Sequence, residues 1–528
     1  MRLFERGAVC SAILVAGLVL GACTAEPPPQ RAAGSTEMPN LVPGVDIPAG
    51  QIDRAVERLD ELAESLLSES GVPGMAVAVV HDGNVVYRKG FGVRNVETRE
   101  PVGPETVFQL ASVSKSLAAT VVARQVTAGT VAWDTPVRER LPWFELGEPY
   151  VSDHVTVGDL FSHRSGLPDH AGDLLEDLGF DRGEVLRRLR LLPLDPFRDS
   201  YAYTNFGLTA AAEAVAAASG MDWEALSEQT LYEPLGMAAT SSRYADFRSR
   251  ANRADGHHLV DGAYRVTDPP RDPDAQTPAG GVSSSVDDVA AWMRLILADG
   301  ALDGREFVAP DALLPAVTPQ AVSQPAQQPD ARSGFYGFGF NVSDSGAGRV
   351  MLSHSGGFDL GAATAFALIP SVNVGIVTLT NGPPIGVPET LNAEFADLVQ
   401  FGDIRQDWRA LYEQAFAPMG APLGDLAGRS PPTDPAPARP LAEYAGTFGN
   451  DYYGPAVVAV AGTELTLTLG PRNMEFPLRH WDGDTFVFTP SGENATAGTV
   501  SRATFDGDRL ILEYYDADGL GTFTRAPG

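Results

Sequence analysis

Residues 108–117 read FQLASVSKSL and place Ser112 three positions before Lys115. Side chains at this spacing project from the same face of a helix, so the hydroxyl and the amine are expected to meet. A serine hydroxyl is a poor nucleophile unless a neighbouring base takes its proton. The apolar run from Leu117 to Val122 indicates burial, which lowers the pKa of a lysine towards the range of a base. The stretch therefore predicts Ser112 as a nucleophile and Lys115 as its base.

The use of cationic residues supports a chemical role for Lys115. The chain has 38 Lys and Arg residues, and only Lys89 and Lys115 are lysines. A chain with this preference would ordinarily use arginine for a solvated cation, so a lysine here suggests a need for a group that can lose its proton. The alternative is a surface lysine that follows a polar helix start. Lys89, at the end of a predicted strand, is expected to lie in solvent.

Two further short patterns follow in the chain, Tyr203-Thr-Asn205 and His354-Ser-Gly356. A second His-x-Gly pattern, His170-Ala-Gly172, is interpreted as incidental. Specificity comes from the surrounding sequences, which are LFSHRSGLP at 160–168, PAGGVSS at 278–284, YGFG at 336–339 and SHSGG at 353–357. Together these motifs resemble the serine β-lactamase-related family, which includes class C β-lactamases, D-alanyl-D-alanine peptidases, D-aminopeptidases and esterases. The resemblance covers roughly residues 50–400.

The resemblance implies roles for the remaining candidate residues. Tyr203 would relay protons to and from the leaving group together with Lys115, and Asn205 would hydrogen-bond an amide of the substrate. The N–H groups of Ser112 and Gly357 would form the oxyanion hole, because the glycines at 356 and 357 allow the substrate carbonyl to approach closely. We expect His163 to stabilise its loop.

His354 stands where β-lactamases of this family mostly carry a lysine. A histidine there is the pattern of several peptidases and esterases in the group. The loss of a permanent cation weakens recognition of a substrate carboxylate, so efficient β-lactam hydrolysis is not expected.

Strand and helix patterns predict an α/β (α+β) sandwich, and the family resemblance implies that it is of the β-lactamase/transpeptidase type. An early hairpin and a late group of strands, separated by mainly helical sequence, indicate one antiparallel sheet built from both ends of the domain and flanked by helices. The predicted elements are a helix at 52–67, a hairpin at 75–87, strands at 336–342, 349–353, 362–368 and 374–380, and a closing helix at 389–399.

The C-terminal sequence predicts a second domain. Prolines mark a linker at 417–437, across whose boundary few contacts are expected. From 438 to 528 the pattern has period two, as in Leu465-Thr-Leu-Thr-Leu469, which suits a small antiparallel barrel of seven or eight short strands. The start, LAEYAGTF at 441–448, is similar to the lipocalin-like domain that often follows such hydrolase domains.

The N-terminal sequence predicts export. Residues 1–22 have a short basic start and an apolar run typical of a signal peptide, and Leu20-Gly-Ala-Cys23 resembles a bacterial lipobox, which implies acylation of Cys23. The alternative is a plain signal peptide with an incidental cysteine. A proline-rich tether at 23–49 would lead to the hydrolase domain at 50–416.

Together these patterns predict a lipid-anchored serine hydrolase of the cell envelope, facing the periplasm or the exterior, that acts on small amides or esters. Muropeptide stems, D-amino-acid peptides and simple esters are the expected substrates, with no metal or organic cofactor. The net charge of −30 argues against nucleic-acid binding. Two alternatives stay open, a true β-lactamase and a non-catalytic binder of cell-envelope peptides.

Overall fold

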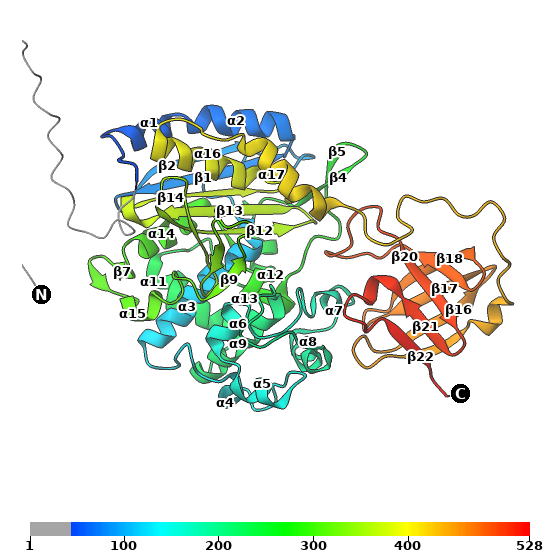
Figure 1. The fold of residues 1–528 in the computed structure, drawn as a ribbon. Helices are drawn as coiled ribbons and strands as arrows, with labels where there is room; N and C mark the ends of the chain where they lie inside the picture. Colours follow the sequence, from blue (N-terminus) through cyan, green and yellow to red (C-terminus); the bar gives the residue numbers. More distant parts are fainter. Residues whose placement is uncertain (1–43, 528) are drawn as a thin grey trace, which may run out of the picture. The chain divides into compact units, whose positions relative to one another are not determined.

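The computed structural model describes residues 44–527. Its centre is an eight-stranded antiparallel sheet in the order β2-β1-β14-β13-β12-β11-β10-β9 (Figure 1). The early hairpin pairs directly with the last strand of the domain, Met75 opposite Thr380, which confirms the prediction of one sheet built from both ends. The strands are β1 (Gly74–His81), β2 (Asn84–Gly92), β9 (Ala321–Gln324), β10 (Gly334–Tyr336), β11 (Asn341–Asp344), β12 (Val350–Phe358), β13 (Ala362–Ile369) and β14 (Val374–Thr380).

Both faces of the sheet are buried because alternate residues of its central strands enter two different apolar clusters. Met75, Val77 and Val79 of β1 pack on one face with leucines of the N-terminal helices. Ala76 and Val80 face the other way into the main core. The first face is covered by α1 (Gln51–Glu57), α2 (Leu59–Ser70) and α16 (Val387–Phe401), which α17 (Trp408–Phe416) follows (Figure 1).

The opposite face carries the helical part of the domain, between residues 114 and 313. Its central helix, α3, is buried along almost all of its length. None of the helices between residues 44 and 527 is long and apolar enough to cross a membrane. The helices of this part are α3 (Ser114–Thr127), α4 (Val137–Arg140), α5 (Pro149–His154), α6 (Val157–Phe161), α7 (Asp173–Asp177), α8 (Arg182–Arg188), α9 (Asn205–Ser219), α10 (Trp223–Ser227), α11 (Glu233–Leu235), α12 (Tyr244–Ser249), α13 (Thr277–Gly280), α14 (Val286–Leu297) and α15 (Pro310–Leu313).

Three small two-stranded sheets lie outside the central one. They are β3 (Phe108–Gln109) with β6 (Ser283–Ser284), β4 (His257–Val260) with β5 (Ala263–Val266), and β7 (Ala301–Leu302) with β8 (Arg305–Glu306). The β3–β6 pair is the one that matters for function, because it fixes the chain immediately before Ser112.

The structure corrects two predicted elements. The helix expected at 52–67 is divided at Arg58 into α1 and α2. The strand expected at 336–342 is interrupted, because β10 ends at Tyr336 and the chain turns, with the Gly337 N–H donating to the Phe340 carbonyl. Gly339 in this turn has a φ of 75° and packs against α3, where a Cβ would lie 2.5 Å from the carbonyl oxygen of Lys115. The turn exists because it packs against the backbone of the helix that carries Lys115.

The C-terminal part is a closed eight-stranded antiparallel barrel, as predicted. Burial alternates along β17 (Glu464–Leu469) as the sequence predicts: Leu465, Leu467 and Leu469 are buried inside the barrel, and the threonines between them are partly exposed. The strands are β15 (Gly446–Gly449), β16 (Ala456–Ala461), β17 (Glu464–Leu469), β18 (Met474–Asp482), β19 (Thr485–Phe488), β20 (Ser501–Asp506), β21 (Arg509–Leu512) and β22 (Thr522–Arg525).

The expectation that few contacts cross the proline-rich boundary is wrong. The barrel loop between β19 and β20 lies against the hydrolase domain, where the Asp177 carboxylate accepts hydrogen bonds from the N–H groups of Glu493 and Asn494, each at 3.0 Å. Glu493 in turn accepts the N–H of Asp359 at 2.6 Å. The described residues, 44–527, accordingly belong to one compact unit.

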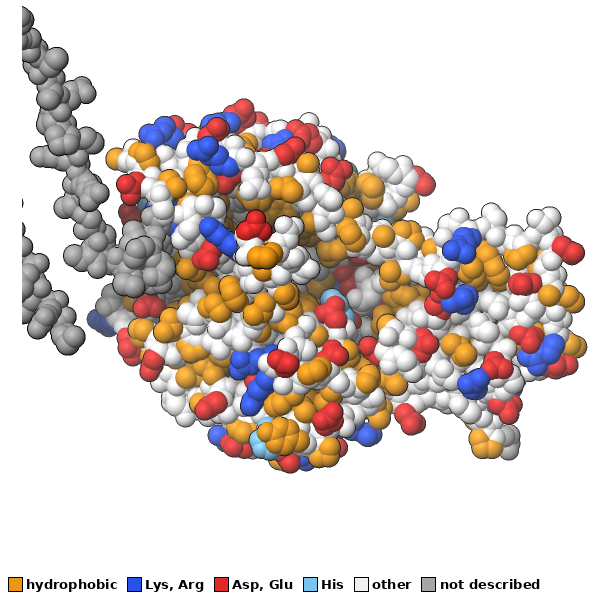
Figure 2. Space-filling view, viewed as in Figure 1, with side chains coloured by type: hydrophobic (Ala, Val, Ile, Leu, Met, Phe, Trp, Pro, Cys, Tyr) orange, Lys and Arg blue, Asp and Glu red, His pale blue; other side chains and the backbone are white. Residues whose placement is uncertain are grey.

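The charged side chains show the acidic composition of the chain. On the face drawn in Figure 2, Lys and Arg side chains occur singly or in small groups among acidic and apolar ones, and they form no broad basic area there. This distribution fits the formal net charge of −30.

The close approach of Gly339 to α3 generates a prediction. Gly339→Ala combines a positive φ with a backbone collision, so it should lower the free energy of unfolding by about 1–3 kcal/mol and slow the reaction of Ser112 with an active-serine probe. Urea unfolding and labelling rates provide the measurements. Gly304→Ala is the matched control, because Gly304 has a φ of 72° but no atom within 4 Å of its added Cβ. Equal effects of the two substitutions on stability and labelling would show that packing of the turn does not position Lys115.

Candidate active site

Ser112 lies on a tight turn between the β3–β6 pair and α3. The preceding residue, Ala111, has a φ of 46°, a region that costs a non-glycine residue about 1 kcal/mol or more. This conformation belongs to a 3₁₀ turn at Ala111–Val113, directly before the first residue of α3. The Ser114 hydroxyl accepts the N–H of Val282 at 3.0 Å and ties the turn to the segment before β6. Ser112 is therefore held on a constrained turn at the start of a buried helix.

Lys115 is fully buried, and its Nζ has three oxygen neighbours. Nζ lies 3.1 Å from the Ser112 Oγ, 2.6 Å from the Asn205 Oδ1 and 3.0 Å from the Ala279 carbonyl oxygen. None of these oxygens carries a formal charge. Burial lowers the pKa of Lys115 to about 7, while the negative charge of Asp173 acts in the opposite direction. At neutral pH an appreciable fraction of Lys115 is an uncharged amine beside Ser112.

Tyr203 closes the other side of this amine. The Lys115 Nζ lies 4.5 Å from the centroid of the Tyr203 ring, and Tyr203 lines the same cavity as Ser112. Burial raises the pKa of Tyr203 well above its usual value. The phenol thus keeps its proton, so the group that can be neutral and basic at pH 7 is Lys115.

Asn205, the first residue of α9, lies between Lys115 and an acidic residue that the motifs did not reveal. Its Oδ1 accepts from Lys115, and its Nδ2 donates to Asp173 Oδ2 at 2.8 Å. Asp173 Oδ2 also lies 2.9 Å from the Nδ1 of His170. The interpretation of His170 as incidental is incomplete, because the structure places this residue in the wall of the site. The three-residue spacing of His170 and Asp173 was the signal available in the sequence.

His354 lies on β12 and is held in one tautomer. Its Nδ1 is 2.6 Å from the Ser355 carbonyl oxygen, which can only accept, so Nδ1 carries the proton. Its Nε2 then accepts from the Tyr336 hydroxyl at 2.7 Å. Burial, followed by the charge of Lys115, lowers the pKa of His354 to about 3. The residue is neutral at physiological pH and supplies no cation to the site.

The glycines of β12 permit its close approach to the nucleophile. A Cβ on Gly356 would lie 2.3 Å from the Leu110 carbonyl oxygen and 2.8 Å from the Ser112 nitrogen. In the described part of the chain β11 pairs with β12 only as far as Ser353, so beyond that residue the strand has an open edge. This arrangement places β12 beside the Ser112 backbone, as an oxyanion hole made with Gly357 would require.

The site opens into a cavity of about 570 Å³ that contains Ser112, Tyr203, Asn205 and His354. Its wall is acidic. Burial raises the pKa values of Glu389 to about 7 and of Asp359 to about 6. Arg271, a buried cation of the wall, is paired with Glu176 at 2.6 Å.

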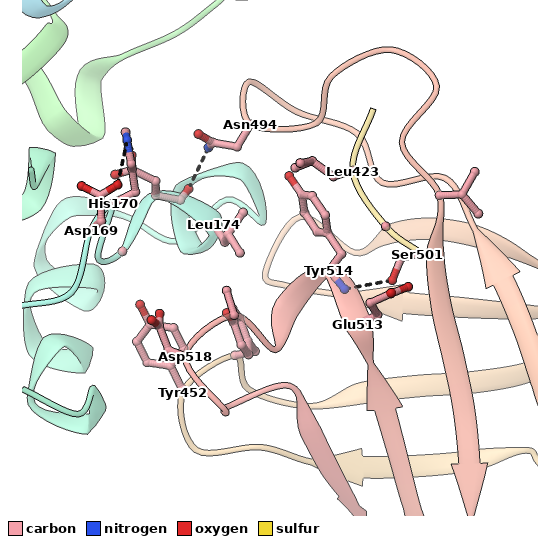
Figure 3. A pocket seen from close by; sticks show the side chains of 16 residues that line it. Asp169, His170, Leu174, Leu423, Tyr452, Asn494, Ser501, Glu513, Tyr514 and Asp518 are labelled. Atoms are coloured by element: carbon pink, nitrogen blue, oxygen red, sulfur yellow. Dashed lines mark hydrogen bonds and ion pairs between the residues drawn. The ribbon is translucent and has the colours of Figure 1, made fainter. Parts of the chain in front are cut away.

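The barrel contributes Glu493, Asn494 and Thr496 to the same wall. A second cavity, of about 320 Å³, shares His170, Asp173 and Asn494 with the first. Figure 3 shows His170 and Asn494 facing it from the hydrolase side and the barrel loop, with Tyr452 and Tyr514 opposite. The loop of the barrel therefore forms part of the boundary of the site, which the sequence motifs did not indicate.

His163 is buried and hydrogen-bonds to the loop that carries Tyr203. Its Nδ1 accepts the N–H of Thr204 at 3.2 Å, and its backbone oxygen accepts the N–H of Ala202. These bonds hold the segment before α9 and thereby the Tyr203 ring.

Comparison with known proteins agrees with this geometry. Residues 52–401 match the family described as Beta-lactamase, and residues 430–510 match a domain of unknown function, DUF3471. The chain is 27% identical over 422 residues to the unguisins hydrolase ungD of Aspergillus violaceofuscus, covering 72% of this chain and 73% of that protein. It is 32% identical over 197 residues to esterase EstB of Burkholderia gladioli, covering 34% and 50%, and 29% identical over 316 residues to a D-aminopeptidase of Gluconobacter oxydans, covering 57% and 54%.

Solved structures with the same fold include an octameric penicillin-binding protein homologue from Pyrococcus abyssi, with a TM-score of 0.59 and 21% identity over 87% of this chain and 98% of that one. A class C β-lactamase from Rhodobacter sphaeroides has a TM-score of 0.53 and 22% identity, covering 65% and 98%. The family match extends over most of the chain and includes Ser112, Lys115, Tyr203 and His354. The chain belongs to the β-lactamase family and is one of its serine hydrolases.

Proposed function

We propose that this hydrolase cleaves small amides or esters through an acyl-enzyme on Ser112. D-amino-acid peptides, peptidoglycan-derived peptides and simple esters are the substrate classes. The observation that carries the proposal is the buried Lys115 amine, 3.1 Å from the Ser112 hydroxyl and surrounded by uncharged acceptors. The names of relatives such as the esterase and the D-aminopeptidase support these classes.

In the acylation step, the neutral amine of Lys115 takes the proton of Ser112 as Oγ forms a bond to the substrate carbonyl carbon. The negative charge moves to the carbonyl oxygen, where the N–H groups of Ser112 and Gly357 stabilise it. When the carbonyl re-forms, the bond to the leaving group breaks. Tyr203, which is protonated and lies beside Lys115, gives its proton to the leaving nitrogen or oxygen and regains one from the Lys115 ammonium.

Deacylation reverses these roles. Water attacks the acyl carbon and loses a proton to the Tyr203–Lys115 pair, while Ser112 leaves with a proton from the same pair. The products are a carboxylic acid and the free enzyme, so no metal or other cofactor is required.

His354 favours an esterase or peptidase over a β-lactamase. The carboxylate of a β-lactam needs a positive partner, whereas His354 is neutral and Arg271 is paired with Glu176. Carboxyl groups such as Glu389 line the same cavity and supply no positive partner for an anionic substrate. These features support uncharged or amine-bearing substrates.

We further propose that the enzyme is exported and anchored by lipid on Cys23. The support is the Leu20-Gly-Ala-Cys23 pattern after a short apolar run, in a chain whose only other cysteine is Cys10. These residues lie outside the part of the chain that the structure describes.

Lys115→Arg should reduce the acylation rate of Ser112 by at least about 100-fold, the low end of a general-base contribution. Arginine keeps the positive charge but does not lose its proton at working pH. The rate is measured with an ester substrate, and folding is checked by thermal melting. A folded Lys115→Arg enzyme with near-native acylation would contradict the base role.

The chain supplies the control in its other lysine. Lys89 is partly exposed, and the structure pairs it with Asp60 at 2.7 Å rather than leaving it free in solvent. Arginine can make the same ion pair, so Lys89→Arg should change activity by less than about twofold.

Cys23→Ser should abolish incorporation of a labelled fatty acid and move the protein out of the membrane fraction of the cells that produce it, because serine cannot be acylated in the same way. Fractionation followed by immunoblotting measures the change. A mutant that stays lipidated or membrane-bound would refute the proposed anchor.

A further inference from the structure

A continuous row of polar contacts leads from Lys115 along the wall of the substrate cavity. Lys115 Nζ contacts Asn205 Oδ1 at 2.6 Å, Asn205 Nδ2 contacts Asp173 Oδ2 at 2.8 Å, and the same oxygen lies 2.9 Å from His170 Nδ1. The four residues come from α3, α9, α7 and the loop before α7. None of the bonds between Asn205, Asp173 and His170 is needed to form or break a bond of the substrate.

The direction of each bond follows from the chemistry of its partners. An ionised carboxylate only accepts hydrogen bonds, so Asp173 must face the amide nitrogen of Asn205. The amide oxygen is thereby turned towards Lys115. A neutral amine has two N–H groups, and Asn205 Oδ1 and the Ala279 carbonyl accept both. Its lone pair is then left facing the Ser112 hydroxyl, which is the orientation that proton transfer requires.

We propose that Asp173 and His170 are positioning residues that fix the orientation of the Asn205 amide and place a compensated negative charge behind Lys115. This inference rests on the proposed role of Lys115 as the base. It gives a function to His170-Ala-Gly-Asp173, a segment that the catalytic motifs of the chain leave unexplained.

The other titratable groups that face Lys115 are neutral near pH 7. Burial lowers the pKa of His163, from the loop after α6, and of His354, from β12. Burial also raises the pKa values of Tyr203 and of Tyr336, from β10. From α13 the contact is the uncharged carbonyl of Ala279. The charges left beside Lys115 are those of Asp173 and, behind it, His170, whose pKa is raised to about 9 by its bond to Asp173.

Other charged side chains lie near His170 and Asp173, and each of them is either exposed to solvent or paired with an opposite charge. Asp169 lies 3.7 Å from His170 and is exposed to solvent. Glu176, on the same helix as Asp173, is paired with Arg271. On the barrel side, Asn494 Nδ2 lies 3.5 Å from the backbone oxygen of Asp173, and Figure 3 shows Asn494 and His170 at the same cavity.

The proposal predicts opposite effects of two substitutions on the pH profile of acylation. Acylation needs neutral Lys115, so its rate rises as pH increases through the pKa of that residue. Asp173→Asn removes the negative charge that stabilises the ammonium form, which moves the rise to lower pH. His170→Asn leaves Asp173 uncompensated, which stabilises the ammonium form and moves the rise to higher pH.

The test is the burst rate of p-nitrophenyl acetate with the full chain, measured between pH 5 and 9. We expect each midpoint to move by about half a pH unit or more in the stated direction. The plateau for Asp173→Asn should fall by about 10- to 100-fold, because the Asn205 amide is no longer held. His170→Arg, which keeps a cation beside Asp173, should bring the midpoint back towards that of the wild type.

Two controls separate this effect from a general loss of stability. Asp397→Asn removes another buried carboxylate, on α16, which accepts a hydrogen bond from the Trp408 indole at 2.7 Å. His258→Asn removes another histidine, whose Nδ1 contacts the Thr267 hydroxyl at 3.0 Å. Neither should move the midpoint. The inference is overturned if the midpoint stays unchanged in both the His170 and the Asp173 variants. If Asp173→Asn does not fold, an unchanged midpoint in His170→Asn alone overturns it. Failure of the proposed function looks different, because Lys115→Arg would then keep its burst.

Discussion

The burial of one amine determines how this enzyme is built. Lys115 has no exposed surface, and the oxygens around its Nζ are uncharged. An ammonium group in such a place is costly, so the fold favours the neutral amine that a serine hydrolase of this kind needs. The negative charge of Asp173 raises the pKa of Lys115 and thereby offsets part of the lowering that burial causes.

Elements from distant parts of the sequence meet to make this environment. The 3₁₀ turn before α3 brings Ser112, and α3 brings Lys115. α9 brings Asn205, and the turn after β10 packs Gly339 against the Lys115 carbonyl. β12 adds neutral His354 and the glycines that approach Ser112. The sheet holds these elements together because its strands are buried on both faces, so small shifts in one element are resisted by packing on the other side.

Much of the hydrolase fold and the central reactive pair could be predicted from the sequence. The spacing of Ser112 and Lys115 is local, and the scarcity of lysine made Lys115 conspicuous. Apolar strands such as β1, β13 and β14 have strong local patterns, and so does the alternation of Leu465, Leu467 and Leu469 in the barrel. The prediction of one strand at 336–342 is wrong, because this segment has a β-like composition but turns after Tyr336, where it packs against α3.

The remaining site residues depend on contacts that no local pattern records. Asp173 and Asn205 are 32 residues apart, and their bond exists only because α7 and α9 come together. Glu493 reaches the cavity from a barrel loop more than one hundred residues beyond β12, although the proline-rich segment suggested an independent domain. These contacts arise only in the folded chain, where distant segments meet.

The fraction of Lys115 that is a neutral amine at physiological pH can be measured directly. The chain has two lysines, so side-chain [¹³C]lysine labelling yields two sets of NMR signals, and Lys115→Arg identifies the set of Lys115. We expect the Lys115 signals to titrate with a midpoint at about pH 7 in the folded enzyme. Lys115 signals that stay those of an ammonium group up to pH 9 would contradict this expectation.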